Sequence, residues 1–202
     1  MERPAVGKVR IMDKQQKKYI YILLTRTSTI LSRIVHLITA DDYTHVSIAF
    51  NENLHPLYSS SRKNGRTLFP AGPCTEKLNK GFWKSHRHVP CAVYKLEVTE
   101  EVYKNAQIEI EKILNRADEY HFNIIGLILC RMNIPYNRKR NYFCSQFVSE
   151  ILGKSKAIKL PKQPCLMRPS DYMKLPELTC CYIGYLNEFQ RNLNYKKVVQ
   201  YM

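Results

Sequence analysis

Residues 141–152 read NYFCSQFVSEIL, and this stretch decides how the chain can fold. Its apolar residues recur at helical spacing and predict an amphipathic helix: Phe147, Val148, Ile151 and Leu152. Cys144 lies one turn before that apolar face, at or near the first turn of the helix. Free backbone N–H groups, the positive end of the helix dipole and the basic residues 138–140 favour a thiolate there. Only a thiolate attacks, so Cys144 is a candidate nucleophile.

An isolated cysteine at a helix start is more often structural, so this interpretation depends on a partner. His45 is the candidate. Residues 44–50, THVSIAF, alternate in character and predict a strand, with His45, Ser47 and Ala49 on one face. A histidine at the start of this strand can reach a neighbouring helix terminus and accept the thiol proton.

The remaining segments predict an α+β fold in which helices pack on an antiparallel sheet. Residues 60–90 contain scattered Gly and Pro and predict a long loop. Strands are expected at 19–24, 44–50, 54–59, 92–98 and 178–189, and helices at 30–38, after Thr99, at 124–132 and at 141–152. We expect a basic N-terminal segment, residues 1–18, followed by a single domain, residues 19–202.

Composition narrows the setting of the protein. No signal peptide or transmembrane segment is recognisable, and the seven cysteines are irregularly spaced, which predicts free thiols and a cytoplasmic location. The formal charge of +15 favours anionic partners. Nucleic acid is not expected, because no helix-turn-helix, RNA-binding or finger pattern accompanies the charge.

Metal-capable residues also occur close together in the sequence: Cys74, His86, His88 and Cys91. Their spacing fits no common structural zinc site, which would show Cys-x-x-Cys pairs. We therefore expect no metal ion and no cofactor.

Three segments together resemble a known family. YTHVSI (43–48), LYSSSRK (57–63) and YFCSQFV (142–148) resemble the circularly permuted NlpC-like, or YiiX-like, papain-fold proteins. The resemblance extends from about Tyr19 to Asp171. In this group the histidine strand precedes the cysteine helix, as it does here. The resemblance implies a permuted papain-like fold with the nucleophile at a helix N-terminus. It also implies that Cys144 and His45 act as a pair.

The resemblance also implies a third polar residue that orients the imidazole. Family members often carry it, frequently as an acid, on the strand after the histidine strand. Here that stretch, residues 57–61, contains no acid. Ser59 is the first choice for the orienting residue, and Glu76 in the long loop is the alternative.

The predicted function is a cysteine hydrolase, similar to a peptidase or amidase, that cleaves an amide or ester bond through an acyl-Cys144 intermediate. The basic charge suits an anionic amide, peptide or lipid-like substrate. An acyltransferase of the same fold is an alternative. A catalytically inactive binding or structural member is another, because of the missing acid after His45.

Overall fold

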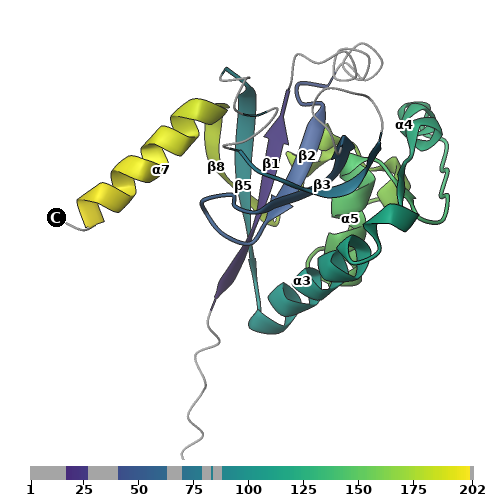
Figure 1. Cartoon of the computed structure of the whole chain (residues 1–202), viewed down its shortest axis with the longest axis horizontal. Coiled ribbons are helices and arrows are strands. Elements are labelled where there is room, and N and C mark those ends of the chain that lie inside the picture. Colours follow the sequence, from purple (N-terminus) through teal and green to yellow (C-terminus); the bar gives the residue numbers. More distant parts are fainter. Residues whose placement is uncertain (1–16, 27–40, 63–69, 79–82, 84–87, 201–202) are drawn as a thin grey trace, which may run out of the picture.

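The computed structural model describes residues 17–26, 41–62, 70–78, 83 and 88–200 (Figure 1). The strands are β1 (Lys18–Thr25), β2 (His45–Ala49), β3 (Leu57–Arg62), β4 (Ala71–Glu76), β5 (Pro90–Val98), β6 (His121–Phe122), β7 (Asn141–Tyr142) and β8 (Leu178–Tyr185). The α-helices are α3 (Glu100–Leu114), α4 (Ile124–Arg131), α5 (Cys144–Lys154), α6 (Pro169–Tyr172) and α7 (Leu186–Gln200). Short 3₁₀ helices occur at Ala117–Glu119 and Pro164–Leu166.

An antiparallel sheet forms the centre of the molecule, with the strand order β4-β3-β2-β1-β5-β8. β6 and β7 form a separate parallel pair. β1 is almost continuously apolar because both faces of the sheet are covered along it. Ile20, Ile22 and Leu24 face one core cluster, and Leu23 faces the other.

Helices α3 and α5 cover one face of the sheet (Figure 1). The apolar residues of α5 that defined its helical spacing all have 0% exposure: Phe147, Val148, Ile151 and Leu152. α3 begins where the sequence predicted, because the Thr99 hydroxyl accepts the N–H of Val102. The predicted antiparallel sheet packed against helices, and with it the α+β class, is confirmed.

The opposite face of the sheet carries a smaller core. Leu186 and Phe189 from the start of α7 pack there with Leu57, Trp83 and Val93. The strand predicted over 178–189 ends at Tyr185, and the chain continues as a helix.

The structure contains a strand that the sequence did not predict. The loop predicted over residues 60–90 contains a strand, β4, which pairs with β3. Its sequence, AGPCTE, does not predict a strand, because Gly and Pro are normally depleted from sheets. Gly72 is required by packing, since a Cβ there would lie 2.9 Å from the carbonyl oxygen of Tyr120. The helix predicted at 30–38 lies outside the described residues.

Two further observations concern the whole described chain. None of the seven cysteines, which all lie in the described residues, forms a disulfide. Among the helices of the described residues, none combines the length and the apolar character needed to cross a bilayer.

Burial of α5 predicts a large stability cost at Ile151. Ile151→Ala leaves a cavity in the main core and should lower the free energy of unfolding by about 2–5 kcal/mol. Ile108→Ala on the exposed side of α3, where Ile108 is 45% exposed, should change it by less than about 0.5 kcal/mol. Urea denaturation of both variants measures the difference, and equal losses would contradict the packing described.

Candidate active site

Cys144 is the first residue of α5 and is 7% exposed. Phe143 occupies the N-cap position and offers no side-chain acceptor. By contrast, Thr99 caps α3 and Asn123 caps α4 with side-chain oxygens. The first-turn N–H groups of α5 therefore lack the side-chain acceptor that the other two helices have, and they can bind an anionic group.

The start of α5 is held by buried hydrogen bonds. Ser60 Oγ on β3 donates to the carbonyl oxygen of Tyr142, 2.7 Å away. The hydroxyl of Tyr172, which is fully buried, donates to the carbonyl oxygen of Ser145 at 2.9 Å and lies 2.7 Å from Ser149 Oγ. These contacts tie the helix start to β3 on one side and to α6 on the other.

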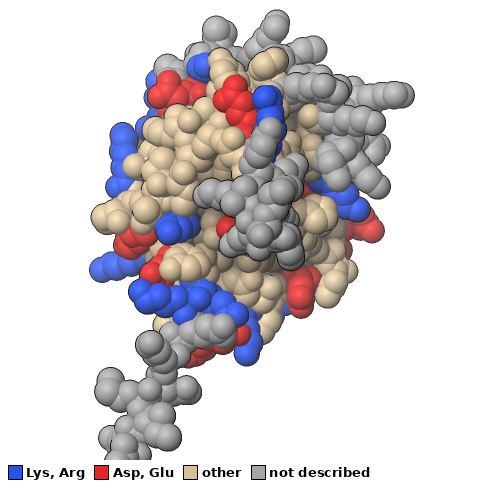
Figure 2. Space-filling model, turned by 90° about the vertical axis from the view of Figure 1, so that its left-hand side faces the viewer, with Lys and Arg blue, Asp and Glu red and all other residues tan. Residues whose placement is uncertain are grey.

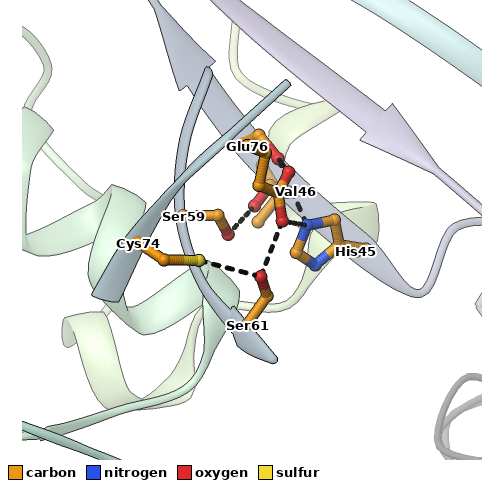
Figure 3. A network of polar contacts seen from close by, with 7 residues as sticks. His45, Val46, Ser59, Ser61, Cys74 and Glu76 are labelled. Carbon is orange, nitrogen blue, oxygen red and sulfur yellow. Dashed lines mark hydrogen bonds and ion pairs between the residues drawn. The ribbon is translucent and has the colours of Figure 1, made fainter. Parts of the chain in front are cut away.

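His45 and Glu76 form the centre of a polar network (Figure 3). His45 Nε2 lies 3.0 Å from Glu76 Oε1. Two serine hydroxyls donate to the same carboxylate: Ser61 Oγ to Oε1 at 2.7 Å, and Ser47 Oγ to Oε2 at 2.9 Å. Ser47 Oγ also lies 3.2 Å from His45 Nε2. The carboxylate thus has partners on both oxygens, from β2 and β3.

Burial and charge act in opposite directions on the two ionisable groups. Burial of the His45 ring lowers its pKa, but the charge of Glu76 and hydrogen bonds to Cys144 and Glu76 outweigh burial and raise the pKa to about 10. Burial likewise raises the pKa of Glu76, but the charge of His45 and the hydrogen bonds from His45, Ser61 and Ser47 outweigh it and hold that pKa below its usual range. The pair is therefore ionised at neutral pH.

The same histidine connects Glu76 to Cys144. Its Nε2 contacts Glu76, and Cys144 contributes with Glu76 to its raised pKa. Because Nε2 faces Glu76, the second ring nitrogen, which points away from Glu76 in Figure 3, is left for Cys144. Glu76 on β4 and Cys144 on α5 thus both interact with His45 on β2.

The structure gives Ser59 a contact other than the imidazole. Its hydroxyl is buried and donates to the carbonyl oxygen of Val46 at 2.8 Å, so it is not placed to orient the imidazole. The alternative residue, Glu76, contacts the ring. Ser47 and Ser61 were not predicted as site residues. Ser47 lies two residues after His45, and Ser61 lies two residues after Ser59, so each shares a strand face with the earlier residue, and this spacing was the signal in the sequence.

A small pocket opens beside Cys144. Its apolar wall includes Leu127, Phe143 and Pro169, and Arg131, Arg168 and Ser145 contribute polar groups. Ser145 is 1% exposed, and its Oγ has no hydrogen-bond partner among the described residues. Among all the residues that the structure describes, no group of three or more His, Cys, Asp or Glu side chains is arranged to hold a metal ion.

The His45–Glu76 pair predicts a specific pH dependence of stability. Between about pH 6.5 and 10, folded His45 keeps a proton that the unfolded chain releases. Its contribution to stability is therefore complete below pH 6.5 and is lost as the pH rises towards 10. The contribution of Glu76 is lost at the acidic end, as the pH falls through its lowered pKa.

Glu76→Gln removes the charge that raises the pKa of His45, so the unfolding free energy should fall less steeply over pH 6.5–10 than in the wild type. Glu177→Gln, at an exposed carboxylate before β8, should keep the wild-type slope. Denaturant titrations at several pH values measure the slopes. Identical slopes in the wild type and Glu76→Gln would contradict the pairing.

Comparisons with known proteins give one informative match. The chain is similar to the crystal structure of the metalloprotein YiiX from Escherichia coli O157:H7, at 12% identity and a TM-score of 0.53. The match covers 83% of this chain and 98% of that one. No protein-family model matches the sequence, and a search of curated proteins gives no match. At this identity the likeness to YiiX concerns the α+β fold alone.

Proposed function

We propose that this protein is a cysteine hydrolase of the permuted papain-like type, with Cys144 as nucleophile, His45 as acid and base, and Glu76 as the residue that orients His45. The observation that carries the proposal is the contact of Glu76 with His45, together with the interaction of His45 with Cys144 at the start of α5, a helix with no side-chain cap. This is the arrangement that nucleophile, base and orienting group require.

The first step is acyl transfer to sulfur. With the pKa of His45 raised to about 10, its imidazole carries a proton before substrate binds, and Cys144 is proposed to attack in its thiolate form. The thiolate sulfur forms a bond to the substrate carbonyl carbon. As the tetrahedral intermediate collapses, His45 gives its proton to the leaving amine or alcohol, and the acyl group stays on Cys144.

The second step is hydrolysis of the thioester. His45, now neutral, takes a proton from water, and the resulting hydroxide attacks the acyl carbon. Thiolate leaves, and the imidazolium–thiolate pair is restored. In both steps the carbonyl oxygen carries negative charge, which the first-turn N–H groups of α5 are positioned to stabilise.

The chain order supports the permuted assignment. His45 on β2 precedes Cys144 on α5, which is the order of the permuted group. The argument for an inactive member was the missing acid after His45, and Glu76 supplies an acid from β4 instead. The pocket beside Cys144 has a volume of only about 10 Å³, so a substrate would bind over its rim, beside apolar Leu127 and Pro169 and the cations Arg131 and Arg168.

The proposal predicts selective alkylation of Cys144. At pH 6, iodoacetamide should label Cys144 at least about tenfold faster than Cys180 or Cys181, which are exposed thiols in the same chain. Burial raises the pKa of Cys91 to about 12 and that of Cys130 to about 11, so these two should stay unlabelled. Peptide-resolved mass spectrometry measures all of these rates together. Labelling of Cys144 no faster than that of Cys180 would refute a catalytic thiolate.

A second prediction separates the two candidates for the orienting residue. Glu76→Gln should slow Cys144 labelling at pH 6 and shift its pH dependence upwards, because the imidazolium loses its counter-charge. Ser59→Ala should leave the labelling rate within about twofold of wild type, although loss of its bond to Val46 costs about 0.5–1.5 kcal/mol of stability. The reverse pattern would restore Ser59 as the orienting residue.

A further inference from the structure

Exposed apolar side chains are concentrated at one place on the described surface. The described surface has nine exposed large hydrophobic residues, and five of them fall between residues 124 and 134. Their exposures are 40% for Ile124, 54% for Ile125, 45% for Ile128, 62% for Met132 and 44% for Ile134. Single exposed apolar residues are ordinary, but a contiguous group of this kind marks an interaction site.

Four of these residues form a stripe along α4. At about 100° per residue, Ile124, Ile125, Ile128 and Met132 fall within roughly 100° of arc around the helix axis. Gly126 and Cys130 lie on the other side of α4 and are buried. In Figure 1, α4 lies at the periphery of the molecule, beyond α5 as seen from the sheet. The stripe therefore faces outwards.

Cations predominate beside the stripe, although Asp118 lines a pocket together with Ile124, Ile125 and Arg138. No Asp or Glu occurs between Glu119 and Glu150, whereas Arg131, Arg138, Lys139 and Arg140 all fall in that interval. Arg138 and Lys139 are exposed, and Glu119 is already paired with Arg116 and Arg140. Figure 2 shows the α7 side of the molecule, where Asp and Glu lie among the Lys and Arg. The stripe is thus apolar, flanked by cations and without an adjacent acid in the sequence.

From this combination we propose that α4 and the following residues 132–140 dock the protein on an anionic membrane surface. The isoleucine stripe would enter the interfacial region, and Arg138 and Lys139 would contact lipid phosphates and carboxylates. A protein partner fits less well. Protein interfaces rely on Trp, Tyr and Arg anchors, whereas this stripe consists of aliphatic side chains. Ile124 and Ile125 also line a pocket of about 770 Å³, which makes a protein partner the alternative that the test must separate.

The proposed docking is independent of catalysis, but it has a geometric consequence. Leu127, Cys130 and Arg131 of α4 line the pocket beside Cys144. The same helix therefore has one side on that pocket and the other on the proposed membrane surface.

Sedimentation with vesicles tests the proposal on the full-length protein. Wild type should co-sediment with phosphatidylcholine vesicles that contain phosphatidylserine, bind far less to pure phosphatidylcholine, and detach as salt is raised. Ile125→Asp/Ile128→Asp should reduce the bound fraction at least about fivefold. Ile108→Asp/Ile183→Asp is the matched control. It adds the same two charges at residues that are 45% and 64% exposed on α3 and β8, and it should bind like the wild type. Circular dichroism checks that both variants are folded.

Three results would overturn the proposal. The first is a wild type that stays in the supernatant with both kinds of vesicle, and the second is an equal loss of binding in the control variant. The third is self-association, measured by sedimentation velocity without vesicles, that is abolished by Ile125→Asp/Ile128→Asp alone. That result would assign the stripe to an interface between copies of the chain. Because vesicle binding needs neither Cys144 nor His45, failure here leaves the proposed hydrolase untouched.

Discussion

The carboxylate of Glu76 imposes the strictest constraint on this molecule. A carboxylate at so enclosed a position is costly unless it is paired and hydrogen-bonded, and here it has His45, Ser47 and Ser61 as partners. These partners lie on two strands, and Glu76 lies on a third. The interactions are satisfied only when β2, β3 and β4 are in register, so the position of the imidazole follows from the pairing of the strands. Removing His45 would leave the carboxylate without its counter-charge, and removing either serine would leave it one hydrogen bond short.

The second constraint joins this part of the sheet to α5. Cys144 can contact His45 only if the helix starts at a fixed place relative to β2. The Ser60–Tyr142 hydrogen bond sets that place from β3, and Tyr172 sets it from α6 through Ser145 and Ser149. The apolar face of α5 then buries its residues against the sheet. Core packing and the polar contacts therefore fix the same helix from different sides, which is how a site is held within a narrow range of geometries.

The sequence predicted the parts of this arrangement that depend on local pattern. The spacing of apolar residues predicted the helix at Cys144 and the strand at His45, and Thr99 predicted the start of α3 as its N-cap. The partner of His45 was harder, because it depends on which strand lies next to β2 and β3. β4 contains Gly72 and Pro73, so it was predicted as a loop. Ser59 was preferred because the family resemblance implies an orienting residue on the strand after the histidine strand. The register places Cys74 opposite Ser59 and Glu76 opposite Leu57. Local composition does not predict such long-range strand pairing.

The helix α4 illustrates how one short element can serve two environments. Its sequence, IIGLILCR, is apolar all round, and such a helix is normally buried on every side. Here only one side is buried, and the isoleucines on the other side meet solvent. A soluble protein gains no stability from exposed isoleucines at these positions, and polar residues would serve a solvent-facing helix equally well. Helix propensity does not explain them either, because isoleucine is a weaker helix former than alanine, glutamate or lysine. The exposed stripe therefore points to a surface that is covered when the protein functions, and the cations beside it indicate the charge of that surface.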